Sequence, residues 1–261
     1  MNLFFTALMF YTRLPVPKHI DHAPDALNRA TVYFPLIGWL VGGIGVGTYW
    51  LGTVLFPPPI LPVLLSMVAT VWVTGAFHED GFADVCDGFG GGWTREQILR
   101  IMKDSRLGTY GTIGLGLLLA VKLFALQSLL GTEAFGPAVA LKYVAAHSLS
   151  RLTAASVIPA LPYARDDADG AKAKPVAQGL TGGQLVVTTL LGLAPLLALI
   201  AYTGIWLYGA FLIPLGLVRW RLIAFFRRWI GGYTGDCLGA TQQLAEVVVY
   251  LSFVSLLWVS V

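Results

Sequence analysis

Charged residues are scarce in this chain: Asp, Glu, Lys and Arg make up 12% of its 261 residues, whereas 56% are hydrophobic. A soluble domain has about 25% charged residues, so the composition excludes that class. The longest polar stretch runs from 78 to 108 and leaves no room for a separate soluble domain between apolar segments. We therefore predict a single polytopic membrane domain that covers residues 1–261.

Cysteine is also scarce, since Cys86 and Cys237 are the only two and have no CxxC spacing. This excludes a disulfide framework and a cysteine-based zinc site, and we expect both thiols to be reduced. The first apolar run has no basic region before it, which argues against a signal peptide. We expect residues 1–17 to form a short interfacial helix that stays on the protein.

Long apolar segments are abundant, and a helix needs about 20 mostly apolar residues to cross a bilayer. Seven segments are candidates: 33–56, 60–77, 109–131, 136–159, 184–203, 205–226 and 243–261. The predicted fold is an all-α integral membrane protein with about seven transmembrane helices plus the N-terminal interfacial helix. The spans contain Lys122, Lys142, His147 and Arg151, whose charges are not expected to face lipid, while the acids are expected at the span ends.

Lys and Arg concentrate in alternate connections, and the segments 57–59, 131–135 and 203–204 contain none. Short loops rich in basic residues stay in the cytoplasm. The sequence thus predicts a cytoplasmic N-terminus and cytoplasmic polar loops, in the inner membrane of a bacterium or archaeon. Membrane topology accounts for these cations, and the net charge is only +3, so they do not indicate nucleic-acid binding.

Residues 78–92 read HEDGFADVCDGFGGG and bring four acids to the end of an apolar span. In a helix Asp80, Asp84 and Asp87 share one face, whereas Glu79 points about 100° away from Asp80. A stripe of carboxylates at this place needs open water or a cation. Hard oxygen ligands favour Mg²⁺, Mn²⁺ or Ca²⁺ over zinc or copper. The alternative is a solvated helix end that marks the membrane boundary.

Four glycines, at 88 and 90–92, follow the acids. We expect them to break the helix and to let the backbone, at Gly90 and Gly91, approach a phosphate ligand. Beyond them, Thr94 and Gln97 have the spacing of a capping box, which predicts a short helix that ends near Lys103.

This short helix and the residues after it carry several cations around one acid, Asp104. Two interpretations remain open. Lys103 and Arg106 hold the oxygens of a diphosphate, with Asp104 as a further metal ligand or base, or the helix is a basic surface that contacts anionic lipid head groups.

Five blocks together resemble the cobalamin synthase family. They are FYTRLPVP at 10–17, FPLIG at 34–38, HEDGFADVCDG at 78–88, IMKDSRLGTYG at 101–111 and GGYTGDCLGA at 231–240, and they occur in the order of that family. The family joins adenosylcobinamide-GDP to α-ribazole or its 5′-phosphate in the membrane and releases GMP. The resemblance implies a phosphoryl-type transfer with a corrinoid nucleotide and α-ribazole as partners, beside membrane lipid.

The resemblance and the side-chain chemistry together assign roles to eleven residues. The expected metal ligands, for Mg²⁺ or Mn²⁺, are Asp80, Asp84, Asp87, Asp104 and Asp236. The expected catalytic residues are Asp80, Asp104 and His78, and the expected substrate-binding residues are Lys103, Arg106, Gly90, Gly91 and Arg13. Two departures from the family pattern, at Glu79 and Cys86, argue against a functional role for these two residues.

Other classes of function predict other patterns. A CDP-alcohol phosphotransferase that makes a phospholipid would use a similar acidic pair, but the AlaArg that should follow it is missing. A prenyltransferase needs a second aspartate-rich motif, and Asp236 has no acidic neighbour. A cation transporter would have acids within the spans near the midplane. The sequence leaves the choice between a monomer and a homo-oligomer open.

Overall fold

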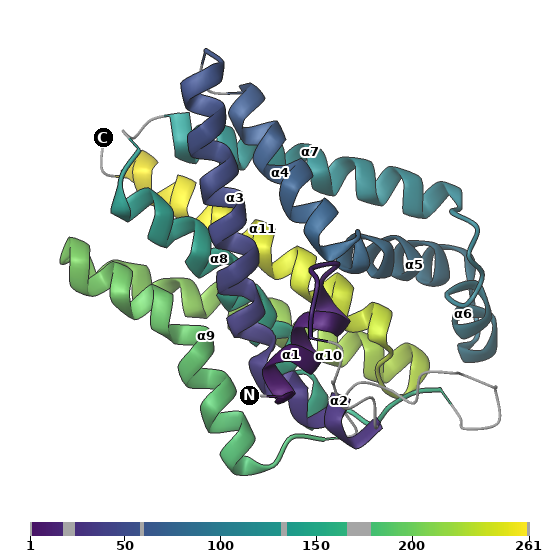
Figure 1. Cartoon of the computed structure of the whole chain (residues 1–261). Helices are drawn as coiled ribbons and strands as arrows, with labels where there is room; N and C mark the ends of the chain where they lie inside the picture. Colours follow the sequence, from purple (N-terminus) through teal and green to yellow (C-terminus); the bar gives the residue numbers. More distant parts are fainter. Residues whose placement is uncertain (1, 18–23, 58–59, 132–134, 166–178, 260–261) are drawn as a thin grey trace.

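The computed structural model describes residues 2–17, 24–57, 60–131, 135–165 and 179–259, and these residues are helical apart from short connections (Figure 1). The long helices are α3 (Phe34–Leu55), α4 (Ile60–Thr74), α5 (Phe77–Gly91), α7 (Thr109–Gly131), α8 (Pro137–Ala155), α9 (Gly182–Thr203), α10 (Leu212–Ile230) and α11 (Gly235–Val259). The short helices are α1 (Asn2–Tyr11), α2 (Pro24–Ala30), α6 (Arg95–Ile101) and three 3-10 turns, Thr31–Tyr33, Ile158–Ala160 and Trp206–Phe211. The predicted all-α class is confirmed.

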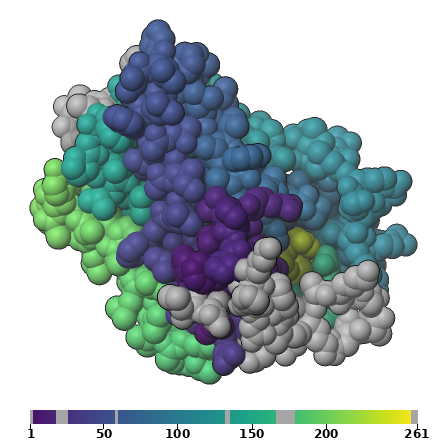
Figure 2. All heavy atoms as spheres, viewed as in Figure 1, coloured from purple at the N-terminus to yellow at the C-terminus, as the bar shows by residue number. Residues whose placement is uncertain are grey.

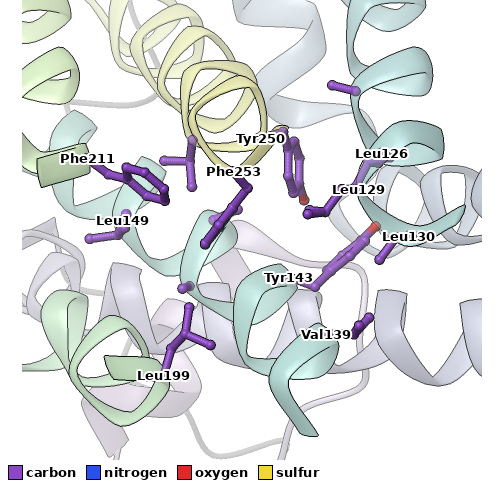
Figure 3. Packing of buried hydrophobic residues seen from close by; sticks show 14 of the residues in the cluster. Leu126, Leu129, Leu130, Val139, Tyr143, Leu149, Leu199, Phe211, Tyr250 and Phe253 are labelled. Atoms are coloured by element: carbon purple, nitrogen blue, oxygen red, sulfur yellow. The ribbon is translucent and has the colours of Figure 1, made fainter. Parts of the chain in front are cut away.

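The main core lies where α7, α8 and α11 meet. Figure 3 shows Tyr143 of α8 and Tyr250 of α11 near Leu126 and Leu129 of α7, all of them buried. In Figure 1, α9 lies at one edge of the bundle and α5, α6 and α7 lie at the other. The side chains that pack in this core are apolar or aromatic, so its cohesion comes from close packing and the burial of apolar surface.

Five described segments are long and apolar enough to cross a membrane: Ala26–Leu55, Thr109–Gly131, Gly182–Thr203, Trp206–Ile230 and Gly235–Leu256. A sixth is possible if α4 and α5 form one broken span. The predicted count was about seven. The difference includes α8, whose Lys142, His147 and Arg151 lower its hydropathy but are all buried. Because α3, α9 and α11 pack around it, α8 does not need an apolar surface of its own.

The chain turns by 87° between α4 and α5. Gly75 and Ala76 both have positive φ values, 66° and 58°, which interrupt the helix at this elbow. Such a conformation is uncommon for a residue with a side chain, as at Ala76. The backbone N–H of Arg13 donates to the carbonyl of Val73 at 2.7 Å, and the Arg13 side chain lies over Gly75. The elbow separates the acidic helix α5 from the apolar helix α4.

The glycines after the acids end the helix, as predicted, at the last of the four positions. Helix α5 continues through Gly90 to Gly91 and ends at Gly92. A Cβ at Gly88 would overlap Met102, and one at Gly90 would overlap the ring of Tyr110. The missing side chains let α6 and the start of α7 pack directly against α5. These glycines therefore allow close helix packing, and the approach of the Gly90 and Gly91 backbone to phosphate stays a prediction.

Candidate functional site

A cavity of about 460 Å³ lies between α1, α3, α5 and the start of α11. In Figure 2, α1 lies at the front of the molecule, and a small patch of the C-terminal part of the chain is visible beside it. Its lining includes the aromatic side chains of Phe10, Tyr11, Phe34 and Phe77 together with the polar side chains of His78, Asp80, Lys103, Arg165 and Asp236. The volume is in the range of small-molecule sites, about 300–1,000 Å³.

Two glycines bring the acids of α5 and α11 together. A Cβ at Gly81 would lie 3.0 Å from the Cα of Asp236, and a Cβ at Gly239 would lie 3.1 Å from the carbonyl oxygen of His78. The two helices therefore touch backbone to backbone. This contact places Asp80 and Asp236, which are far apart in the sequence, in the wall of the same cavity.

Asp236 is held by the segment that precedes it and by residues near 163. The N–H of Tyr233 donates to the carbonyl of Pro162 at 2.9 Å, and the N–H of Ala164 donates to the carbonyl of Tyr233 at 2.8 Å. This short parallel bridge places Arg165 beside Asp236, and the Arg165 Nη2 lies 2.8 Å from the Asp236 Oδ2. The same oxygen accepts a hydrogen bond from the Thr234 hydroxyl at 3.2 Å. Arg165 was not among the predicted site residues.

Asp84 is half-buried, one turn along α5 from Asp80. Asp80 and Asp236 repel its charge, and Arg165 attracts it. Asp84 therefore lies within reach of the charges of both cavity carboxylates and of Arg165. Of the five predicted aspartate ligands, Asp80 and Asp236 line the cavity.

The carboxylates offer hard oxygen donors, but in the described part of the chain no group of three or more His, Cys, Asp or Glu side chains is placed to hold a metal ion. Mg²⁺ at phosphate sites is usually bound through one or two carboxylates together with waters and substrate phosphates. The donors present fit that arrangement. They do not fit an all-protein site such as the five-aspartate set predicted from the sequence.

Asp87 is buried and has other partners. Its Oδ2 accepts from the N–H of Gly108 at 2.7 Å, and its Oδ1 accepts from the N–H of Gly111 at 2.8 Å. The first N–H groups of a helix have no partner within the helix. Asp87 supplies those partners for α7, and a side chain at Gly108 or Gly111 would overlap its oxygens. The structure therefore gives Asp87 a structural role at the start of α7.

Asp104 and Arg106 pair with each other outside the cavity. The Arg106 Nη2 lies 2.6 Å from the Asp104 Oδ2, and the Arg106 Nε donates to the same carboxylate at 3.1 Å. These hydrogen bonds lower the pKa of Asp104 below its ordinary value, which makes it a weaker base. Of the three residues proposed for the phosphate clamp and base, Lys103 alone lines the cavity.

His78 lies on the cavity wall as a buried side chain. Its ring stacks on Phe34, with centroids 5.5 Å apart and planes 17° apart, and its Nε2 has no hydrogen-bond partner. Its neighbour Glu79 points into the bundle and accepts a hydrogen bond from Gln243 at 2.8 Å. The predicted divergence of Glu79 from the aspartate face is confirmed.

A cluster of buried charged residues lies next to His78 and Glu79. One of its members shows that not every acid lies at the end of a span. Glu246 is buried in the middle of α11, although the acids were expected at the span ends. It pairs with Lys122 of α7 and lies 3.4 Å from His147 of α8. Buried charges of this kind are paired, and the pairing joins three helices.

The chain is similar over nearly its whole length to a known family and to named proteins. The family described as cobalamin-5-phosphate synthase matches residues 3–254. Adenosylcobinamide-GDP ribazoletransferase of Shewanella frigidimarina is 49% identical over 252 residues, covering 96% of this chain and 93% of the relative. The protein of the same name from Leptothrix cholodnii is 43% identical over 264 residues, covering 98% and 96%. No solved structure shows significant similarity. The chain belongs to the cobalamin-5-phosphate synthase family.

Proposed function

We propose that this protein transfers the adenosylcobinamide-phosphate group from adenosylcobinamide-GDP to α-ribazole or its 5′-phosphate, with release of GMP. The names of its relatives support this reaction. The observation that carries the proposal is that Asp80, Asp236, Arg165 and Lys103 line one cavity together with aromatic side chains, with Asp84 one turn along α5 from Asp80. Carboxylates, cations and an apolar wall match a substrate that combines a diphosphate with large ring systems.

In this proposal the chain's own residues bind, orient and accept a proton. Lys103 and Arg165 hold diphosphate oxygens and stabilise the charge that collects on the leaving phosphate. Asp80, which is exposed to the cavity, accepts the proton of the attacking ribose hydroxyl. Tyr11 and Phe34 pack against the flat ring of the acceptor and exclude water. Asp84 and Asp236 would hold Mg²⁺ or Mn²⁺ together with substrate oxygens, and a bound divalent ion neutralises diphosphate charge.

The membrane arrangement belongs to the same proposal. We place the N-terminus and the acidic cavity on the cytoplasmic side of the inner membrane, because the basic loops lie at that end of the spans. We count α8 as a seventh span, shielded from lipid by α3, α9 and α11. Membrane lipid is then a permanent partner, and a homo-oligomer remains compatible with this arrangement.

The direct test uses purified protein in detergent with adenosylcobinamide-GDP, α-ribazole and Mg²⁺. We expect release of GMP together with formation of a cobalamin. Chelation of the divalent ion should stop turnover, and added Mg²⁺ or Mn²⁺ should restore it. Parallel incubation with a CDP-alcohol in place of the corrinoid nucleotide should yield no CMP. Absence of GMP release, while a control enzyme is active in the same mixture, would refute the proposed function.

A further inference from the structure

A second recess of about 380 Å³ lies next to the catalytic cavity, between α6 and the segment that ends at Arg165. Among the described residues, its polar lining consists of Arg95, Arg100, Lys103 and Arg165 with one acid, Glu96. The recess is therefore strongly cationic, unlike the mixed cavity beside it. Its volume falls in the range of small-molecule sites, about 300–1,000 Å³.

Hydrogen bonds to backbone carbonyls fix the position of this recess. The Arg95 Nη2 donates to the carbonyl of Ala164 at 2.7 Å, and its Nε donates to the carbonyl of Ile230 at 3.1 Å. Arg95 thus anchors α6 to the segment before Arg165. The helix starts at the predicted N-cap, since the Thr94 hydroxyl accepts from the N–H of Gln97 at 3.3 Å. These contacts hold the cations of α6 opposite Arg165.

Two residues, Lys103 and Arg165, line both the recess and the catalytic cavity. A ligand whose phosphates contact these two side chains can extend in both directions. On one side it meets the aromatic residues and the two carboxylates that line the cavity, and on the other it meets the mainly cationic lining of the recess. A substrate with an apolar ring system on one phosphate and a nucleoside on the other matches this asymmetry.

We propose that the recess binds the nucleoside phosphate end of the substrate, which leaves as GMP. This inference rests on the proposed function, because it assigns one end of the same diphosphate. Arg100 contacts the nucleotide phosphate, Arg165 and Lys103 bridge the two phosphates, and Arg95 keeps the recess in shape. Guanidinium groups suit phosphate because they donate paired hydrogen bonds to its oxygens.

An anionic lipid head group also carries a phosphate and is the alternative ligand for the recess. The connection of the recess with the catalytic cavity through Lys103 and Arg165 favours the nucleotide. A head-group site would not need to share side chains with the carboxylate wall. The experiment below separates the two sources.

The test compares Arg100→Gln with the wild type in neutral detergent. Arg100 is exposed and lines only the recess. We expect about a tenfold higher KM for adenosylcobinamide-GDP and about a tenfold weaker inhibition by GMP, the effect of losing one charge-assisted contact. The KM for α-ribazole should not change. Arg221→Gln is the matched control, because Arg221 is an exposed arginine that lies over Trp220, away from both cavities.

Binding of GMP alone, measured by calorimetry, makes the result independent of turnover. If the protein binds GMP through Arg100 but transfers nothing, the proposed function is wrong, and the recess is a nucleoside monophosphate site that serves another reaction. If it turns over and Arg100→Gln leaves the KM and the GMP inhibition unchanged, the recess assignment is wrong. An effect of Arg100→Gln that appears only in nanodiscs with phosphatidylglycerol, and not with phosphatidylcholine, would identify a lipid head-group site and overturn the assignment.

Discussion

At the scale of single residues, the five predicted aspartates divide by what already contacts their oxygens. Asp80 and Asp236 line the cavity, and Asp84 lies one turn along α5 from Asp80. Asp87 and Asp104 are engaged elsewhere, one with the start of α7 and the other with its neighbour two residues on. A shared residue type and a shared helical face therefore do not imply a shared role.

The role proposed for Asp80 predicts a large kinetic effect. Asp80→Asn removes the proton acceptor, and kcat for GMP release should fall by about 10²–10⁴-fold, the usual contribution of a positioned base. The KM for the corrinoid nucleotide should change much less. Asp104→Asn is the control, because Asp104 faces solvent beside Arg106, and its kcat should stay close to that of the wild type. The opposite ranking would move the base to Asp104.

The role of Asp87 predicts a loss of stability. Asp87→Ala leaves the N–H groups of Gly108 and Gly111 without their acceptor, which should cost about 1–3 kcal/mol of unfolding free energy. Thermal unfolding in detergent measures this as a lower midpoint. Asp84→Ala should raise or preserve the midpoint, since it removes a charge that Asp80 and Asp236 repel. If Asp87→Ala leaves the midpoint of thermal unfolding unchanged but abolishes the Mg²⁺ dependence of activity, Asp87 is a metal ligand and the structural role is wrong.

At the scale of helices, the contact of α5 with α11 determines the site. Gly81→Ala places a Cβ against the backbone of Asp236 and should push the two helices apart, at a cost of about 1–3 kcal/mol. The rate of GMP release should also fall, because Asp80 and Asp236 then move apart. Gly116→Ala in α7 is the matched control, since its Cβ would meet no atom within 4 Å, and it should be neutral or slightly stabilising. Full activity of Gly81→Ala would show that the close contact is not required.

At the scale of the whole molecule, the proposed orientation can be tested by labelling. In a background without Cys86 and Cys237, a cysteine at Thr94 should react only with reagents on the cytoplasmic side. A cysteine at Ile205, in the exposed turn between α9 and the next 3-10 helix, should react only from outside. Whole cells and inverted vesicles with a membrane-impermeant maleimide supply the measurement. Labelling of Thr94→Cys from outside would reverse the topology.

The sequence alone determined the helical class, the membrane character and the acidic helix. Apolar length and charge asymmetry follow from local composition, and the spacing of Asp80 and Asp84 is a property of one helix. The tertiary structure alone decided which of the acids meet. The pairing of Arg165 with Asp236 depends on a backbone bridge between residues far apart in the chain, and the role of Asp87 depends on where α7 begins. Likewise, α8 tolerates its charges because neighbouring helices enclose them, and enclosure is a property of packing that the pattern of one segment cannot specify.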